Sequence, residues 1–348
     1  MTSLPGPGSI TDVPGVRVGH AQRIGRGWRT GTTVVFVPGG AVAGVDVRGG
    51  GPGTRETDAL HPQNLVDTVH AVCLSGGSAY GLSAADGVQR WLEQRHLGVR
   101  VGPEPWAVVP VVPSAVIFDL GRAGSFANRP DAAFGQRAIS AARRHPPGRG
   151  AVGAGSGAIA GRLQGGVGTA SMVVGDIVVG ALAVVNAAGA VIDPATGLPW
   201  EATGHGLRRP SSVERNLLAE ATSLPAPSPL NTTIGVVATS ARLSKAEAGK
   251  LASVCHDGLA RCVRPAHSMF DGDTVFALAT GQHELPGTGT AFRDTTSRPA
   301  SFNQVLDAAS RAFAAACTDA IVCARGVGGP PAFRDLCPSA FLAWPTDG

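Results

Sequence analysis

The residues Asn231-Thr232-Thr233 stand where a proline-rich connector, 223–229, meets a run of β-branched residues typical of a strand. A threonine at this junction could act as a nucleophile without a histidine if the backbone were cut before Thr232. The freed α-amine has an ordinary pKa of about 7.7–8.0 and would serve as the base for the threonine hydroxyl. A threonine pair at the start of a strand is also common in ordinary sheets, so this pattern alone leaves the chemistry open.

Other catalytic arrangements find less support. Gly76-Gly77-Ser78-Ala79-Tyr80 departs from the Gly-x-Ser-x-Gly nucleophile elbow, because tyrosine stands where the last glycine is needed. Lys245 and Lys250 are not followed by Ser or Thr, which excludes a P-loop. The nine histidines show no His-Glu-x-x-His spacing, and no clean Gly-x-Gly-x-x-Gly follows a strand. We therefore expect neither a metal nor another cofactor.

Composition and charge narrow the classes of protein further. The chain has 348 residues, a net charge of +4 and 43% apolar residues, so it can bury a large core and is not expected to bind nucleic acid or a membrane. Its most apolar stretch, 177–192, contains Asn186 and is too short for a membrane helix. The first six residues do not resemble a signal peptide, and no Cys-x-x-Cys pair occurs, which favours a cytoplasmic location.

Strands and helices alternate along the chain, which indicates a layered α/β or α+β architecture. Strands are expected at 16–18, 32–37, 44–48, 230–239 and 274–278, with two buried strands and a turn within 177–192. Helices are expected near 78–95, 130–144, 211–221, 244–265 and 301–317. Ser244 with Glu247 and Ser301 with Gln304 have the spacing of capping boxes.

Six segments together resemble the self-cleaving hydrolases that include the L-aminopeptidase D-Ala-esterase/amidases, the β-peptidyl aminopeptidases and the nylon-oligomer hydrolases. They occur in family order and span most of the chain, so the combination is more specific than any single match. The segments are ITDVPGVRVGH (10–20), DVRGGGPGTRET (46–57), LSGGSAYGL (74–82), GAGSG (153–157), NTTIG (231–235) and FDGDT (270–274).

The resemblance implies a four-layer αββα sandwich, within the α/β class, formed by a single hydrolase domain. It also implies that the precursor cleaves itself between Asn231 and Thr232, producing chains 1–231 and 232–348 that stay associated. Thr232 would then be both the nucleophile and, through its new amine, the base. Members of this family usually assemble into tetramers or larger rings, so a homo-oligomer is expected.

The resemblance assigns further site residues by position. Tyr80, the only tyrosine in the chain, matches a family tyrosine whose hydroxyl helps to bind the oxyanion. Asn186 matches an asparagine whose amide can donate hydrogen bonds to the same developing charge. Asp271 and Asp273 match a carboxylate pair of the nylon-oligomer hydrolases that could hydrogen-bond the amine and hydroxyl of Thr232. Without the family, these residues would be read as a packed aromatic residue, a turn asparagine and a solvated acidic turn.

One position departs from the nylon-oligomer branch. Where those enzymes have an active-site lysine, this chain has Arg162. Arginine keeps the positive charge but cannot shuttle a proton at neutral pH. Arg162 could point inward and bind a carboxylate, or it could turn to solvent. The substitution bears directly on whether nylon oligomers are cleaved.

The expected function is therefore a self-processing amide hydrolase that forms an acyl-enzyme on Thr232. Its expected substrates are short peptides or amides with a free amino end, or linear ω-amino-acid oligomers such as those of 6-aminohexanoate. An acyltransferase resembling the ornithine acetyltransferases, which share the fold, is one alternative, although no Lys-Gly-x-Thr frame occurs near residue 231. An uncleaved scaffold or binding protein is another.

Overall fold

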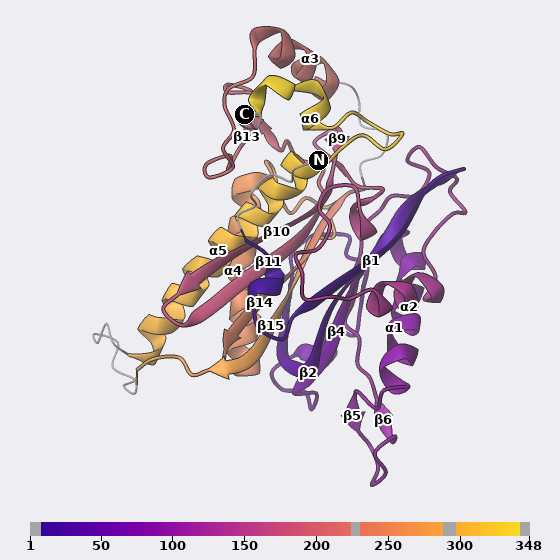
Figure 1. The fold of residues 1–348 in the computed structure, drawn as a ribbon, viewed down its shortest axis with the longest axis vertical. Helices are drawn as coiled ribbons and strands as arrows, with labels where there is room; N and C mark the ends of the chain where they lie inside the picture. The colour runs from indigo at the N-terminus through magenta and orange to yellow at the C-terminus, as the bar shows by residue number, and fades with distance from the viewer. Residues whose placement is uncertain (1–7, 224–229, 288–296, 342–348) are drawn as a thin grey trace, which may run out of the picture.

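A mixed sheet of nine strands forms the centre of the computed structural model, which describes residues 8–223, 230–287 and 297–341. The strand order is β10-β11-β14-β15-β2-β4-β7-β3, and β1 pairs with β2 (Figure 1). The strands of this sheet are β1 (Arg17–Gly25), β2 (Trp28–Val47), β3 (Thr54–Arg55), β4 (Thr68–Ser75), β7 (Ser114–Val116), β10 (Gly166–Val174), β11 (Ile177–Asn186), β14 (Thr232–Ala241) and β15 (Thr274–His283).

Helices and small two-stranded ladders complete the described fold. The helices are α1 (Ala84–Glu93), α2 (Ala132–Ser140), α3 (Ser212–Ser223), α4 (Lys245–Cys262), α5 (Arg298–Cys323) and α6 (Phe333–Leu336), with short 3₁₀ turns that include η3 (Ser78–Ser83). The ladders are β5 (Val99–Arg100) with β6 (Val108–Val109), β8 (Ile159–Ala160) with β9 (Leu163–Gln164), and β12 (Ile192–Asp193) with β13 (Leu198–Pro199). Among the described helices, none has both the length and the apolar composition needed to cross a membrane.

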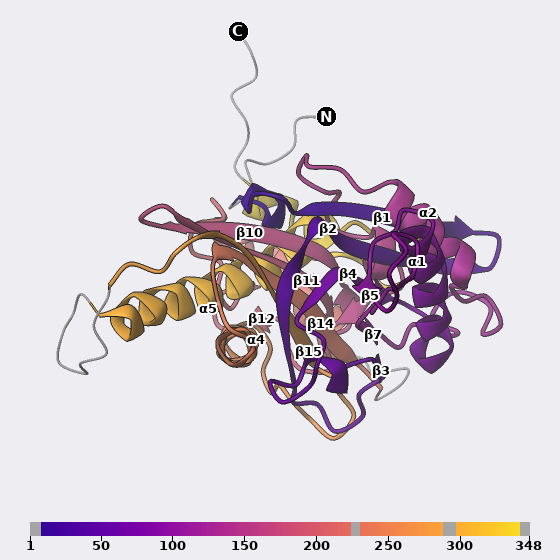
Figure 2. The ribbon, with the colours of Figure 1, turned by 90° about the horizontal axis from the view of Figure 1, so that it is seen from below.

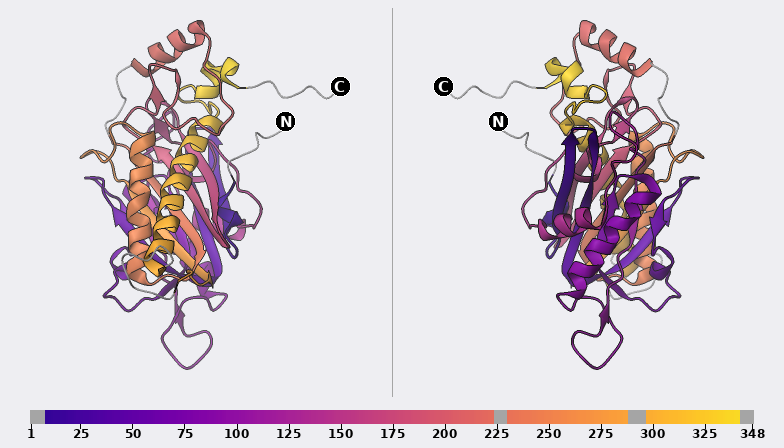
Figure 3. Two further views of the ribbon diagram at one scale, coloured as in Figure 1. Left: turned by 90° about the vertical axis from the view of Figure 1, so that its left-hand side faces the viewer. Right: turned by 90° about the vertical axis from the view of Figure 1, so that its right-hand side faces the viewer.

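The sheet curls over itself, and helices cover both of its outer faces. Figure 2 shows α4 and α5 on one side and α1 and α2 on the other, and the two views of Figure 3 show these faces in turn. Alternate residues of β11 lie in two different hydrophobic clusters, because successive side chains of a strand point to opposite faces of the sheet. Leu182 and Val184 share an interior cluster with Val35 of β2, whereas Ala183 lies in the cluster that contains Phe313 of α5.

The expected αββα order of layers is therefore confirmed, but the two β layers are one continuous sheet. The strand β2 joins them because it is twenty residues long and shifts register between Phe36 and Ala41. Its first part pairs with β1 and β4, and its last part pairs with β15. Pro38-Gly39-Gly40 lies at the shift, where proline and glycine suit an interruption of strand pairing.

Four strand ends meet at one edge of the sheet. The strands β14 and β15 run parallel, with Ile234 opposite Thr274, so both begin at this edge. Their outer neighbours run antiparallel and therefore end there: Asn186 of β11 pairs with Thr232, and Val47 of β2 pairs with Thr274. Residues at the start of β14 and β15 and at the end of β11 are thus brought together by strand direction alone.

Several element predictions need correction. The two strands within 177–192 exist as β11 and β12, but β11 pairs with β10 and β14, while β12 pairs with β13. The helix expected from residue 78 begins as the 3₁₀ turn η3 before α1. The helix α5 begins at Arg298 rather than near Ser301, because Ser297 caps it by accepting the Ala300 N–H.

One predicted capping box is confirmed, and the predicted connector lies almost entirely outside the described residues. The capping box of Ser244 and Glu247 is present at the start of α4, with each side chain bonded to the other residue's backbone N–H. The proline-rich connector at 223–229 falls, except for Ser223, outside the described residues.

Close contact between α5 and β10 depends on a glycine, and this can be tested. A Cβ atom added to Gly168 would lie 2.1 Å from the Ala316 carbonyl oxygen and 2.3 Å from the Ala320 nitrogen. Because backbone cannot move aside cheaply, we expect Gly168→Ala to destabilise the fold by about 1–3 kcal/mol and to lower Tm, measured by circular dichroism.

Gly249→Ala is the matched control. Outside its own helix, no described atom lies within 4 Å of a Cβ built at Gly249 of α4. This substitution should raise stability by about 0.5–1 kcal/mol, because alanine favours a helix interior. Equal melting temperatures for Gly168→Ala and the wild-type protein would contradict the packing described here.

Candidate active site

Thr232, the first residue of β14, places its hydroxyl beside the peptide bond that precedes it. The side chain is 5% exposed, and its hydroxyl contacts and donates to the Asn231 carbonyl. The same oxygen accepts the Gly272 N–H at 3.1 Å. Asn231 forms a parallel bridge with Asp271, and its N–H donates to the Phe270 carbonyl at 3.1 Å. The hydroxyl is thus held between its own preceding carbonyl and a backbone donor of the neighbouring loop.

The two aspartates hold the surroundings of this hydroxyl. Asp273 Oδ1 accepts the Thr233 N–H at 2.6 Å, and its Oδ2 lies 2.8 Å from His267 Nδ1. Asp271 Oδ2 accepts the N–H and hydroxyl of Ser268 at 3.0 and 2.5 Å. The carboxylates therefore bond to the adjacent strand residue and to their own loop. The backbone N–H between them, rather than a carboxylate, contacts the Thr232 hydroxyl.

Asp271 keeps one acceptor unused. Burial raises the pKa of its carboxyl, and the Asp273 charge adds to this, while the Ser268 donors and the nearby Ala188 N–H act to lower it. Its Oδ1 is buried and has no hydrogen-bond partner among the described residues. A buried oxygen without a donor is costly, so this site suits a nearby cationic group. Within the described residues, no group of three His, Cys, Asp or Glu side chains could hold a metal ion.

Asn186 lies fully buried beside Thr232, its partner across the β11–β14 ladder. Its Oδ1 accepts from Arg122 Nη1 at 2.7 Å and from the Ile159 N–H at 2.9 Å. Its Nδ2 donates to the Phe118 carbonyl at 3.3 Å. These three bonds fix the orientation of the Asn186 amide. Because an amide nitrogen carries two N–H groups, one N–H of Nδ2 is left for another acceptor.

Arg122, which sequence reasoning missed, joins these groups. It is 7% exposed, and its Nη1 bonds Asn186. Its Nη2 contacts the Leu230 carbonyl and lies 3.2 Å from Asn231 Oδ1. One guanidinium therefore holds both residues before Thr232 and the asparagine beside it. The sequence offers no sign of this, because 29 Lys and Arg less two lysines leaves 27 arginines, and this one lies in no recognisable motif.

Behind Arg122 lies a buried carboxyl group. Asp119 accepts the Thr30 hydroxyl at 2.6 Å and the Gly77 N–H at 2.7 Å. Burial raises the pKa of Asp119 to about 6, although both donors and the charges of Arg122 and Arg29 act to lower it. Burial also lowers the pKa of Arg122 to about 10, against the attraction of Asp119. Arg29 Nη1 bonds the Arg122 carbonyl at 3.1 Å, which ties the network to β2.

Tyr80 lies near this network but does not contact the threonine. It follows Gly77, whose N–H binds Asp119, by three residues in η3. The ring is 54% exposed and stacks under the Arg129 guanidinium at 3.7 Å. Its hydroxyl makes no hydrogen bond within the described part of the chain. A role for Tyr80 in binding an oxyanion stays a prediction.

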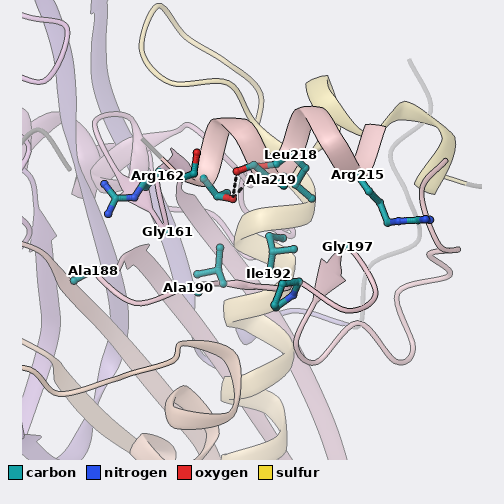
Figure 4. A pocket seen from close by; sticks show the side chains of 13 residues that line it. Gly161, Arg162, Ala188, Ala190, Ile192, Gly197, Arg215, Leu218 and Ala219 are labelled. Atoms are coloured by element: carbon teal, nitrogen blue, oxygen red, sulfur yellow. Dashed lines mark hydrogen bonds between the residues drawn. The ribbon is translucent and has the colours of Figure 1, made fainter. Parts of the chain in front are cut away.

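Arg162 stands apart from these groups, at the tip of the β8–β9 hairpin. It lines a cavity of about 450 Å³, together with residues of α3 and of the segment that follows β11 (Figure 4). The side chain is half-buried, and its Nη1 is fully buried. Of the two orientations left open by the sequence, the structure shows the one in which Arg162 borders a cavity.

Comparisons with known proteins agree with this fold. The family model "Peptidase family S58" matches residues 8–332. An "uncharacterized aminopeptidase" of Mycobacterium tuberculosis is 50% identical over 345 residues, covering 96% of this chain and 99% of that protein. The 6-aminohexanoate-oligomer endohydrolase of Kocuria sp. is 36% identical over 286 residues, covering 80% and 76%.

Two solved structures share the fold. The Burkholderia sp. beta-aminopeptidase matches with a TM-score of 0.71 and 24% identity, covering 99% of this chain and 98% of that one. The L-aminopeptidase D-Ala-esterase/amidase of Ochrobactrum anthropi, described as a variant of the Ntn hydrolase fold, matches with a TM-score of 0.71 and 21% identity, covering 97% and 92%.

The family match and the relatives together define a hydrolase of peptide or amide bonds. The chain belongs to peptidase family S58. The resemblance drawn from the six sequence segments is thereby confirmed.

The buried Asp119 carboxyl should leave a mark on the pH dependence of stability. Its folded pKa of about 6 exceeds the ordinary value of 3.8, so between these pH values the folded chain keeps a proton that the unfolded chain releases. The contribution of this group to the free energy of unfolding therefore falls as pH rises through that window. We expect Asp119→Asn to remove this component, measured as the pH dependence of Tm. Parallel pH profiles for variant and wild type would contradict the assignment.

Proposed function

We propose that Thr232 is the nucleophile of this hydrolase and that the chain activates itself by cleavage between Asn231 and Thr232. The observation that carries the proposal is the position of the Thr232 hydroxyl, which contacts the Asn231 carbonyl while accepting the Gly272 N–H at 3.1 Å. A hydroxyl in this position is close to the carbonyl carbon that it must attack. The contacts of Arg122 with Leu230 and Asn231 support the same reading, because they restrain the chain before the cleaved bond.

The proposed cleavage proceeds in two steps. Thr232 Oγ1 attacks the Asn231 carbonyl carbon, the C–N bond breaks, and the acyl group passes to oxygen as an ester while the nitrogen gains a proton. Water then hydrolyses the ester, which releases the Asn231 carboxylate and restores the hydroxyl. The remaining amide donor of Asn186 supports the negative charge that forms on the carbonyl oxygen.

After cleavage, the new amine of Thr232 takes up the role of base. It removes the proton of its own hydroxyl as that oxygen attacks an amide substrate, and it returns a proton to the leaving amine. The acyl group stays on Thr232 as an ester, which water then hydrolyses to release the acid and restore the hydroxyl. The unused Oδ1 of Asp271 is a fitting partner for this amine when protonated. Asp273, held by His267, keeps the Thr233 backbone in place so that the amine and hydroxyl stay aligned.

The substrate class follows from the family and the relatives. We propose short peptides or amides with a free amino end, including linear ω-amino-acid oligomers such as those named for the Kocuria enzyme. A homo-oligomeric state and a cytoplasmic location remain predictions. Acyl transfer to an added amine that outpaced hydrolysis would instead indicate an acyltransferase.

The nucleophile can be tested by intact-mass spectrometry. We expect the wild-type protein to give two fragments that separate before Thr232, and Thr232→Ala to give one unbroken chain without amidase activity. Thr232→Ser should still cleave, because it retains the hydroxyl. A wild-type chain that stays intact over days, or a Thr232→Ala chain that breaks at the same bond, would contradict the proposal.

Arg122 should set the rate of self-cleavage. We expect Arg122→Gln to slow cleavage by about 10- to 100-fold, because the segment before Thr232 and the Asn186 amide lose their shared donor. Arg122→Lys keeps the charge but cannot bond several groups at once, so it should be intermediate. The measurement is the cleaved fraction against time after synthesis, by mass spectrometry.

The control is Arg149→Gln, in which another partly buried arginine loses its 2.8 Å ion pair with Asp319. It should lower Tm without slowing cleavage. Cleavage of both Arg122 variants at the wild-type rate would show that this arginine does not position the site.

A further inference from the structure

The cavity beside Arg162 has apolar walls and a cationic end. Figure 4 shows α3 above it, with Leu218 and Ala219, and the segment after β11 below it. Its apolar lining includes Ala188, Ala190, Val191, Ile192, Leu218 and Ala219. Two arginines also line it, and none of the described residues that line it is acidic. Arg215 points away from Arg162 and donates to the Pro210 carbonyl at 2.8 Å, so among the described residues that line the cavity Arg162 is the cation with an unpaired buried donor.

The backbone that presents Arg162 is strained. Gly161 and Arg162 form the two-residue turn between β8 and β9, with φ angles of +52° and +73°. A two-residue hairpin with two positive φ angles favours Asn-Gly, and a long side chain at the second position is unusual. Arg162 Nη1 is also buried without a hydrogen-bond partner among the described residues. Strain and an unpaired buried donor in one residue suggest that a ligand completes the site.

The cavity adjoins the proposed nucleophile through a short stretch of backbone. The backbone N–H of Ala188, which lines the cavity, lies close enough to the Asp271 carboxyl to lower its pKa. Ala188 lies two residues beyond Asn186, a span of about 7 Å in extended chain. The Gly161 N–H donates to the Ala187 carbonyl at 3.1 Å, which fixes the hairpin against this segment. A substrate held at Thr232 could therefore extend into the cavity.

We propose that this cavity is a substrate subsite in which Arg162 binds the terminal carboxylate of a short amide or peptide, while the apolar walls contact the chain before it. The inference rests on the proposed function of Thr232. A guanidinium pairs with a carboxylate through two parallel N–H donors, which explains the use of arginine here. Because no acidic residue occurs in the described part of the lining, the charge of Arg162 is left to the ligand. The enzyme would thus distinguish free acids from their neutral amides.

Binding tests the subsite without any catalysis. Hexanoate and hexanamide, which differ in charge but share one chain, are titrated by calorimetry into the wild-type protein. We expect hexanoate to bind about 10- to 100-fold more tightly, the range of a charged hydrogen bond. Arg162→Gln should abolish this difference, and Arg162→Lys should keep part of it. Arg215→Gln is the matched control and should keep it in full. Equal binding of both probes to the wild type, or a difference that survives in Arg162→Gln, would overturn the proposal.

Kinetics separate this inference from the function on which it rests. A linear 6-aminohexanoate dimer is compared with its carboxamide, and the free acid should have a KM about tenfold lower that rises to the amide value in Arg162→Gln. Hydrolysis of both substrates with equal KM would overturn the subsite while leaving the hydrolase intact. Selective binding of hexanoate by a chain that stays uncleaved before Thr232 and hydrolyses neither these substrates nor short peptides would overturn the proposed function while leaving the subsite. Normal folding of Arg162→Lys, checked by Tm, keeps the comparison valid if Arg162→Gln is unstable.

Discussion

The parallel pairing of β14 with β15 is the constraint on which the site depends. Parallel strands begin at the same edge, so the loop that leads into β15 must lie beside Thr232 at the start of β14. Gly272 in that loop approaches closely: a Cβ there would lie 3.0 Å from Thr232 Oγ1 and 2.8 Å from the Gly51 carbonyl. The antiparallel strand β11 ends at the same edge and adds Asn186. Strand direction thus assembles three distant segments around one hydroxyl.

Burial strengthens the hydrogen bonds of the polar groups at this edge, but it also disfavours their charged forms. Arg122 and Asp119 are almost wholly removed from water, which disfavours both charged forms and moves their pKa values toward each other. Hydrogen bonds from Thr30 and Gly77 to the carboxyl, and from Arg122 to the residues before Thr232, offset part of that cost. In such a medium each remaining interaction is stronger and more directional than in water. The network therefore fixes the positions of the groups around Thr232 more than it stabilises the fold.

The groups proposed for catalysis and the segments that border the cavity belong to different parts of the fold. The edge holds the groups proposed for bond cleavage, whereas α3 and the β8–β9 hairpin border the cavity next to it. Such peripheral segments can change without disturbing strand pairing, because few ladder bonds depend on them. Arg162 is one of these positions, and the relatives carry names that refer to different activities, an aminopeptidase and an oligomer endohydrolase. The residues proposed to bind the substrate chain thus lie on different segments from those proposed to cleave it.

The sequence by itself determined the family, the layered α/β class and the local signals. Six ordered segments identified the hydrolase, and the capping box at Ser244 marked the start of α4 where the structure has it. Only the tertiary structure decided that β2 joins both layers and that Arg122 reaches Asn231, 109 residues away. The reason is physical: periodicity and capping report which face of an element is buried and where it ends. Which distant side chains meet depends on strand order and direction, and these carry no local pattern.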